Sequence, residues 1–154
     1  MIYSKTHWDI SPKEAIRLQN DLREKVILKW DNRYINTIGG VDVSFKDKRA
    51  ICAITAFTFP ALQPFDSSRL ELPVTFPYVP GLLAFREGPA IMEAWENLNK
   101  KPDLLMFDGQ GLAHPRKFGI ACHIGVLLNL PAIGIGKTRL YGTHNEPGTA
   151  KGSY

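Results

Sequence analysis

The spacing of apolar residues predicts a helix at the start of the chain. After Ser11, apolar residues recur at helical intervals from Ala15 to Val26, with charged residues between them. Ser11 is a typical N-cap residue, and Glu14 stands where a capping box would reach back to it. The pattern predicts an amphipathic helix that lies on a sheet and ends before Trp30.

The period then changes from helical to strand-like. Over residues 37–45, Val41 and Val43 fall on one face of the predicted strand and Asp42 falls on the other. Residues 50–59 are apolar on both faces, and the polar turn between the two segments predicts an antiparallel hairpin.

The second half of the chain alternates helix and strand patterns. Residues 60–72 resemble a loop and an irregular third strand, which Pro64 assigns to the edge of a sheet. A helix–strand crossover then places the last two strands parallel to each other. The elements expected here are a helix starting near Pro89, a strand over 104–107, a helix over 118–128 and a strand over 131–136.

These elements together predict an α/β fold. Its mixed sheet has an antiparallel meander followed by parallel strands, with flanking helices, in a single domain over residues 1–154. Lys and Arg outnumber Asp and Glu by 19 to 15, a basic excess that is compatible with a polyanionic partner without requiring one.

The remaining composition indicates a cytoplasmic protein. No signal peptide or membrane span is visible in the sequence. Cys52 and Cys122 lie in apolar runs without metal-site spacing, so we expect buried free thiols. His123 lies on the predicted third helix, where we expect a packing residue with satisfied hydrogen bonds.

Two aspartates stand at positions that are unusual for purely structural residues. Asp108 follows the strand at 104–107, at the carboxyl end where α/β sheets bind ligands, and Gly109 and Gly111 let the backbone approach a ligand closely. An Asp–Gly pair is also a common turn former. Asp42 requires a compensating cation if its strand is buried, or else lies on an edge strand whose second face meets water.

A stiff aromatic tip precedes the predicted second helix. Pro77 and Pro80 flank Tyr78, and no helix or strand pattern provides a place to bury its ring. An exposed ring of this kind suits stacking on a nucleobase. The alternative is that Tyr78 folds back on the core. Glu87 closes this segment just before the helix expected from Pro89.

Convergence of the three acids would predict a metal site. Asp42, Glu87 and Asp108 would repel each other unless a hard cation such as Mg²⁺ or Mn²⁺ lay between them. Such a site can activate water for phosphodiester cleavage. Lys137 would emerge on the same rim as a phosphate contact, and His114 would orient a ligand or contact substrate. Carbohydrate hydrolysis also fits the acids but leaves the basic rim and the aromatic tip unexplained.

Four segments of the chain resemble, in order, the motifs of the endonuclease V family, the deoxyinosine 3′-endonucleases. The resemblance implies a ribonuclease-H-like fold and Mg²⁺-dependent nicking of DNA at hypoxanthine, with Mn²⁺ able to substitute. It implies cleavage of the second phosphodiester bond 3′ to the lesion, which leaves a 3′-hydroxyl and a 5′-phosphate. The segments are residues 40–45, 76–87, 107–116 and 133–137.

The same resemblance assigns roles to individual residues. Asp42 and Asp108 match metal ligands, and Glu87 matches the third catalytic and metal-binding carboxylate. Tyr78 matches the wedge that separates the strands, and Lys137 matches the lysine at the cleaved phosphate. The pocket for the extruded base is matched by Pro80, Gly81, Leu83, Gly109, Gly111 and His114.

One departure from the family concerns length. Family members continue beyond the region of Lys137 with a further strand, a late histidine and a closing helix, so this chain is expected to be truncated. Three hypotheses follow: a monomeric repair endonuclease for DNA containing deoxyinosine, an endoribonuclease for inosine-containing RNA, and a non-catalytic fragment that binds nucleic acid.

Overall fold

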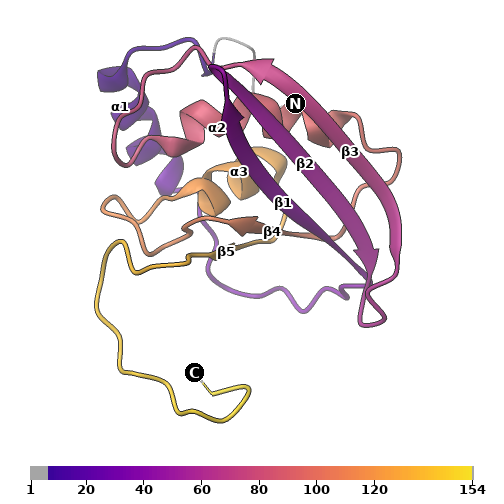
Figure 1. The fold of residues 1–154 in the computed structure, drawn as a ribbon. Coiled ribbons are helices and arrows are strands. Elements are labelled where there is room, and N and C mark those ends of the chain that lie inside the picture. The colour runs from indigo at the N-terminus through magenta and orange to yellow at the C-terminus, as the bar shows by residue number, and fades with distance from the viewer. Residues whose placement is uncertain (1–6, 154) are drawn as a thin grey trace.

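A mixed sheet forms the centre of the computed structural model, which describes residues 7–153 (Figure 1). Across the sheet the strands lie in the order β3 (Pro64–Pro73), β2 (Arg49–Thr58), β1 (Thr37–Lys46), β4 (Leu104–Asp108) and β5 (Ala132–Ile135). Strands β1, β2 and β3 pair antiparallel, whereas β4 is parallel to both β1 and β5. The predicted meander followed by parallel strands is therefore confirmed.

The hairpin between β1 and β2 closes with two residues. Asp47 and Lys48 both have left-handed backbone conformations, with φ angles of 48° and 61°. Such turns match the twist of the strands that they join. At the other side of β2, β3 begins with Pro64 and lies at the edge of the sheet, as predicted.

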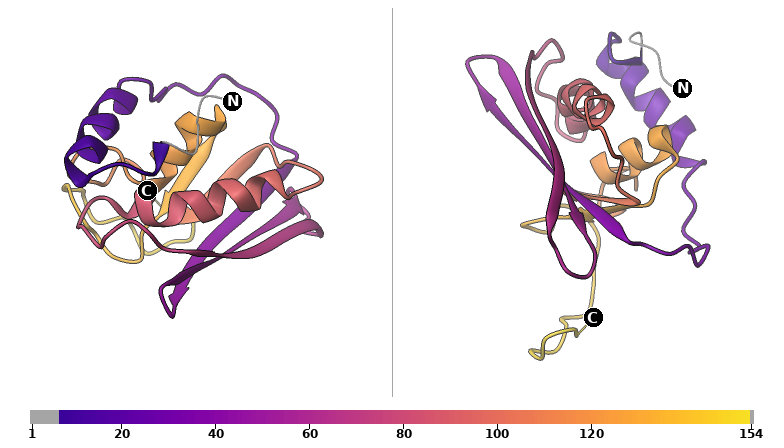
Figure 2. Two further views of the ribbon diagram at one scale, coloured as in Figure 1. Left: turned by 90° about the horizontal axis from the view of Figure 1, so that it is seen from above. Right: turned by 90° about the vertical axis from the view of Figure 1, so that its right-hand side faces the viewer.

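The three helices of the described chain lie on one side of the sheet (Figure 2). They are α1 (Pro12–Arg23), α2 (Leu83–Glu96) and α3 (Ile120–Leu128). Helix α2 packs on β2 and β3, α3 packs on β4 and β5, and α1 contacts α3. The prediction that α1 lies on the sheet is wrong, because its apolar stripe is covered by other segments. Ala15 packs in a cluster with Phe85, and Leu22 packs in a cluster with Phe118.

Helix α1 begins as predicted and ends earlier. The Ser11 hydroxyl accepts the Glu14 N–H, and the Glu14 carboxylate accepts the Ser11 N–H, which completes the capping box. The helix stops at Arg23 rather than near Trp30. Val26 N–H donates to the Arg23 carbonyl in a four-residue turn, and the residues beyond it are mostly exposed.

Helix α2 begins at Leu83, so the predicted start near Pro89 is wrong. Glu87 consequently lies inside the helix rather than in front of it. A Gly–Pro pair usually breaks a helix, because proline lacks a backbone donor and glycine favours other conformations. Here a Cβ on Gly88 would collide with the Trp8 ring, so the glycine allows the close packing that holds the helix through Pro89.

The main core lies between the sheet and helices α2 and α3. Ile54 and Phe107 from the sheet meet Ile91 from α2 and Ile124 from α3. No helix within residues 7–153 covers the opposite face of the sheet. Asp42 lies on that face and is exposed although β1 is a central strand. The edge-strand interpretation of Asp42 is therefore wrong, whereas the exposure that it proposed is observed.

The cysteines and His123 follow their predictions in part. Both cysteines are free thiols, and Cys52 is buried while Cys122 is half-buried. His123 is completely buried among aromatic rings, and its Nε2 lies 2.9 Å from His7 Nε2. Its Nδ1 has no hydrogen-bond partner in residues 7–153, so the prediction of full satisfaction is wrong. Among the same residues, no helix has the length and apolarity to span a membrane.

Candidate active site

Two of the predicted acidic residues occupy neighbouring strands at the same level. Val41 of β1 pairs with Phe107 of β4 in the parallel register. Asp42 and Asp108 are the residues that follow this pair, and Asp108 is the last residue of β4. The parallel pairing therefore brings together two carboxylates that are far apart in sequence.

Glu87 lies on helix α2, close enough to the two aspartates for their charges to act on it. Its side chain is only 8% exposed. Burial, together with the negative charges of Asp42 and Asp108, raises the pKa of Glu87 to about 8, against a smaller opposing effect of Arg86. The group is thus a buried carboxyl whose ionisation is disfavoured by two other carboxylates.

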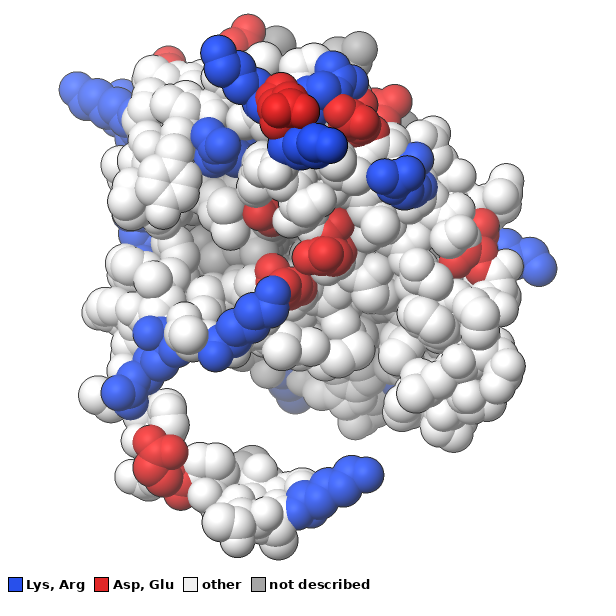
Figure 3. Space-filling view, in the orientation of Figure 1, with Lys and Arg blue, Asp and Glu red and all other residues white. Residues whose placement is uncertain are grey.

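Lys137 supplies a positive charge at this place. Its Nζ lies 2.5 Å from Asp108 Oδ2, and the bond raises the pKa of Lys137. The prediction that Lys137 emerges on the same rim as Asp108 is confirmed, because β5 lies parallel to β4. Figure 3 shows acidic side chains gathered beside a basic one near the middle of the face seen in Figure 1.

These carboxylates fit a hard divalent cation. The donor atoms are all oxygens, and a bound cation would offset the like charges that disfavour ionised Glu87. Within residues 7–153, no three His, Cys, Asp or Glu side chains are arranged as a complete metal-binding group. Mg²⁺ usually keeps several waters and takes only one or two carboxylates, so a complete protein cage is not required. The ligand roles of Asp42, Glu87 and Asp108 stay predictions.

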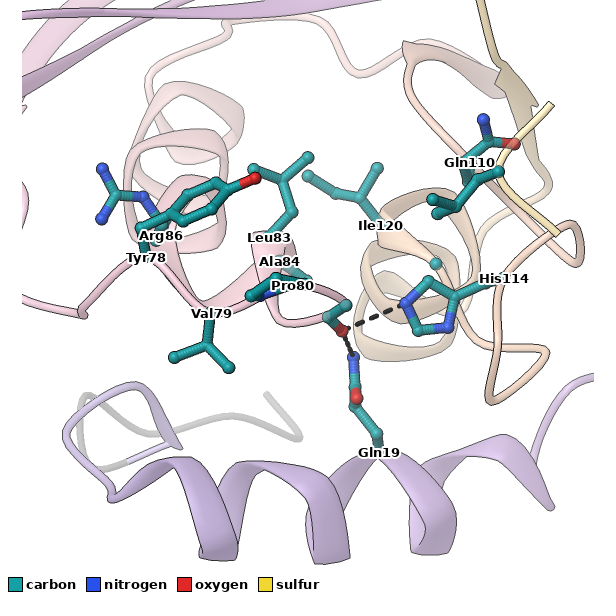
Figure 4. Close-up of a pocket in the computed structure, with 13 residues that line it drawn as sticks. Gln19, Tyr78, Val79, Pro80, Leu83, Ala84, Arg86, Gln110, His114 and Ile120 are labelled. Atoms are coloured by element: carbon teal, nitrogen blue, oxygen red, sulfur yellow. Dashed lines mark hydrogen bonds between the residues drawn. The ribbon is translucent and has the colours of Figure 1, made fainter. Parts of the chain in front are cut away.

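A pocket of about 210 Å³ lies beside the start of α2 (Figure 4). It is smaller than the roughly 300–1,000 Å³ of sites for drug-sized ligands, which suits a single planar group such as a nucleobase. Thirteen residues line it: Gln19, Tyr78, Val79, Pro80, Gly81, Leu83, Ala84, Arg86, Gln110, His114, Gly119, Ile120 and Leu140.

The lining contains five of the residues predicted to bind substrate and lacks two. Gly109 and Gly111 do not line the pocket, and their backbones instead anchor the loop after β4. Gly109 N–H donates to the Ile135 carbonyl, and the Gly111 carbonyl accepts Gly119 N–H. The five that line the pocket are Tyr78, Pro80, Gly81, Leu83 and His114.

Sequence reasoning missed several of the lining residues. Gln110, Ile120 and Leu140 reach the pocket through the tertiary fold, and no local pattern marks them. Gln19, by contrast, could have been identified from the sequence. It occupies a position on the buried stripe of α1, four residues after Ala15, where an apolar residue is the usual choice.

The tip that carries Tyr78 projects from the protein. The residue is 76% exposed, so the alternative in which it folds back on the core is wrong. The Arg86 guanidinium lies 5.8 Å from the centre of the Tyr78 ring, and its Nη1 donates to the Phe76 carbonyl. The ring is held beside the pocket with most of its surface free to stack. Its role as a wedge stays a prediction.

His114 is neutral and held in one tautomer. Its Nδ1 accepts Arg116 N–H, and its Nε2 therefore carries the proton that it donates to the Gly81 carbonyl. Burial lowers the pKa of His114, and the charge of Arg116 lowers it further. Both ring nitrogens are used within the protein.

The sequence and the fold are similar to those of known endonuclease V proteins. The sequence pattern of the family described as Endonuclease V matches residues 20–154. Endonuclease V of Dictyoglomus turgidum is 47% identical over 142 residues, which are 92% of this chain and 62% of that protein. The chain thus spans less than two thirds of the length of this relative.

Solved structures show the same fold. The crystal structure of endonuclease V from Streptomyces avermitilis superposes with a TM-score of 0.90 at 36% identity, over 99% of this chain and 69% of that one. Endonuclease V of Ciona intestinalis, solved with a 23mer DNA containing an inosine followed by a ribo-adenosine, has a TM-score of 0.73 at 27% identity, over 84% of this chain and 59% of that one. The expected ribonuclease-H-like architecture is confirmed.

Proposed function

The chain belongs to the endonuclease V family, and on this premise we propose that it is a Mg²⁺-dependent repair endonuclease that nicks DNA at deoxyinosine. The cut falls at the second phosphodiester bond 3′ to the hypoxanthine base. One observation carries the proposal: the first turns of α2 contribute both to the lining of the pocket and, through Glu87, to the three carboxylates Asp42, Glu87 and Asp108. Leu83 and Arg86 line the pocket, and Glu87 is the next residue of the same helix.

The pocket and the tip suit an extruded base. A base that leaves the duplex loses its stacking, and an exposed tyrosine can take the vacated place at a gain of about 1–3 kcal/mol. Tyr78 stands at the mouth of a pocket whose walls are mainly apolar and backbone. The relative from Ciona intestinalis was solved with inosine-containing DNA, which supports the same substrate here.

The carboxylates of Asp42, Glu87 and Asp108 are suited to phosphodiester hydrolysis. Asp42 and Asp108 present carboxylate oxygens from adjacent strands, and Glu87 presents a third from α2. A bound divalent cation polarises water and neutralises charge on the reacting phosphate. Lys137 holds an ammonium beside Asp108, where it can contact that phosphate. Hydrolysis breaks the P–O3′ bond, so the water oxygen joins the 5′-phosphate and the 3′ oxygen leaves as a hydroxyl.

The test is nicking of a duplex that carries one hypoxanthine. We expect cleavage with Mg²⁺ or Mn²⁺, none with EDTA, and none of the matched duplex with adenine. Asp42→Ala and Asp108→Ala should abolish cleavage while lesion binding is largely kept. Asp21→Ala, which removes an exposed acid on α1, is the matched control. Normal cleavage by either active-site variant would refute the metal assignment.

The remaining aspects of the proposal are tested with the same protein. Matched RNA and DNA oligonucleotides with one inosine distinguish the deoxyribonuclease from the endoribonuclease. Binding of the hypoxanthine duplex without any nicking would support the non-catalytic alternative. A monomer in sedimentation and a cytoplasmic location are further predictions.

A further inference from the structure

The carbonyl of Gly81 accepts hydrogen bonds from side chains of two other segments of the chain. Gln19 Nε2, from α1, donates to it at 3.0 Å. From the loop before α3, His114 Nε2 and Arg116 Nη2 donate to the same oxygen at 3.1 and 2.7 Å. Figure 4 shows Gln19 and His114 reaching this oxygen from different directions.

Gln19 is the least expected member of this group. It is 1% exposed, and both ends of its amide are used within the protein. While Nε2 donates to Gly81, Oε1 accepts Arg116 Nε at 2.6 Å. An apolar residue would suffice to pack α1, and burial of an amide is tolerated only when its hydrogen bonds are made. The polar side chain at this position is therefore explained by its hydrogen bonds to Gly81 and Arg116.

Gly81 lies at the end of the tip that carries Tyr78, where the backbone turns into α2. Its φ angle is +80°, and an added Cβ would lie 2.5 Å from Arg116 Nη2. The Gly81 carbonyl shares a rigid peptide plane with Leu82 N–H, which donates to the Val79 carbonyl and closes the turn of the tip. Donors that orient the carbonyl thus also orient the turn between Tyr78 and α2.

We propose that Gln19 is a positioning residue for base recognition. Gln19 and Arg116 form a clasp on the Gly81 carbonyl, and the clasp sets the position of the Tyr78 tip against the loop that holds His114. The pocket between these two walls then has a constant width before a base enters. This inference deepens the proposed function and rests on it for the identity of the base.

A purely structural Gln19 would behave differently from a positioning residue. If the amide only stabilised the protein, its loss would lower the free energy of unfolding and leave base selectivity unchanged. If the clasp positions the tip, its loss also frees the Leu82 amide and reduces the preference for the lesion. A hydrogen bond to a charged partner corresponds to about a tenfold effect.

The first experiment compares Gln19→Leu with Asn20→Leu, which removes an exposed amide at the next position of α1. Native-state hydrogen exchange at Leu82 should be about tenfold faster in Gln19→Leu and unchanged in Asn20→Leu. The ratio of dissociation constants for the adenine and hypoxanthine duplexes, measured with Ca²⁺ to prevent cleavage, should fall about tenfold in Gln19→Leu only.

The second experiment is a double-mutant cycle with Arg116→Lys. Lysine keeps the charge but replaces the planar guanidinium, whose Nε and Nη2 bond Gln19 and Gly81 in one fixed geometry, by a single flexible ammonium. Since both residues act through one carbonyl, the double variant should lose little more selectivity than either single variant. Arg116 is less buried than Gln19, so this variant also tests the clasp if Gln19→Leu fails to fold.

The outcomes separate the two proposals. Unchanged Leu82 exchange in both single variants overturns the clasp, whatever the substrate. Additive losses of selectivity in the cycle also overturn it. Failure of the unmodified protein to prefer hypoxanthine overturns the proposed function instead. Faster exchange together with reduced selectivity supports the clasp.

Discussion

The buried histidine of α3 makes the stability of this protein depend on pH. Burial, together with the neighbouring His7, lowers the pKa of His123 from the ordinary value of about 6.5 to about 3. When the chain unfolds, the imidazole regains its ordinary pKa. Between these two values the unfolded chain binds a proton that the folded chain does not bind.

The sign and size of the effect follow from the two pKa values. Because the folded pKa is the lower one, the stability contributed by neutral His123 is fully present above about pH 6.5. It is lost as the pH falls from 6.5 towards 3. Each pH unit in this window costs about 1.4 kcal/mol, so the loss at pH 5 is about 2 kcal/mol. That is a large part of a typical 5–15 kcal/mol of total stability.

The assay is urea unfolding at pH 8, 7, 6 and 5, followed by tryptophan fluorescence. Trp8 packs against the His123 ring, with ring centres 5.4 Å apart, and reports on this region. His123→Gln keeps a polar side chain of similar size that does not titrate. Between pH 8 and 5 it should lose about 2 kcal/mol less than the unmodified protein.

Two controls make the prediction refutable. His144→Gln removes an exposed histidine and is the matched control for the loss of an imidazole. In the unmodified protein, NMR should show that the His123 ring does not titrate above pH 5. Parallel stability curves for the unmodified protein and His123→Gln, or a His123 ring that titrates near pH 6.5, would refute the reasoning.

Two further predictions concern the aromatic tip and the first helix. Tyr78→Ala should bind a hypoxanthine duplex about tenfold more weakly, with a smaller loss on single strands, whereas Tyr34→Ala, an exposed aromatic outside the pocket lining, should bind both normally. Equal losses on both substrates would remove the wedge role. Ser11→Ala should lower the free energy of unfolding by about 1 kcal/mol in urea titrations, because the capping box is lost; an unchanged midpoint would show that the cap contributes nothing.

Local patterns were sufficient for the strands that carry the aspartates. The alternation around Asp42 and the apolar run before Asp108 each lie within a few residues, so period and composition report them directly. The crossover rule then placed β5 parallel to β4 and Lys137 beside Asp108. These predictions depended on sequence neighbours and on a general rule of chain topology.

Other features depended on partners that no local pattern contains. The Gly88–Pro89 pair indicated a helix start, yet packing against Trp8 lets α2 run through it and buries Glu87. The interpretation of Asp42 as an edge-strand residue failed because the side chain meets water on the uncovered face of a central strand.

By itself, the sequence determined the order of the elements, the capped start of α1 and the strand ends that carry Asp42, Asp108 and Lys137. These features follow from backbone preferences and from the spacing of apolar residues. Only the tertiary structure decided the burial of Glu87, the shape of the pocket and the role of Gln19. The partners of Gln19 lie 62 and 97 residues away, and burial and hydrogen bonding are properties of such distant contacts.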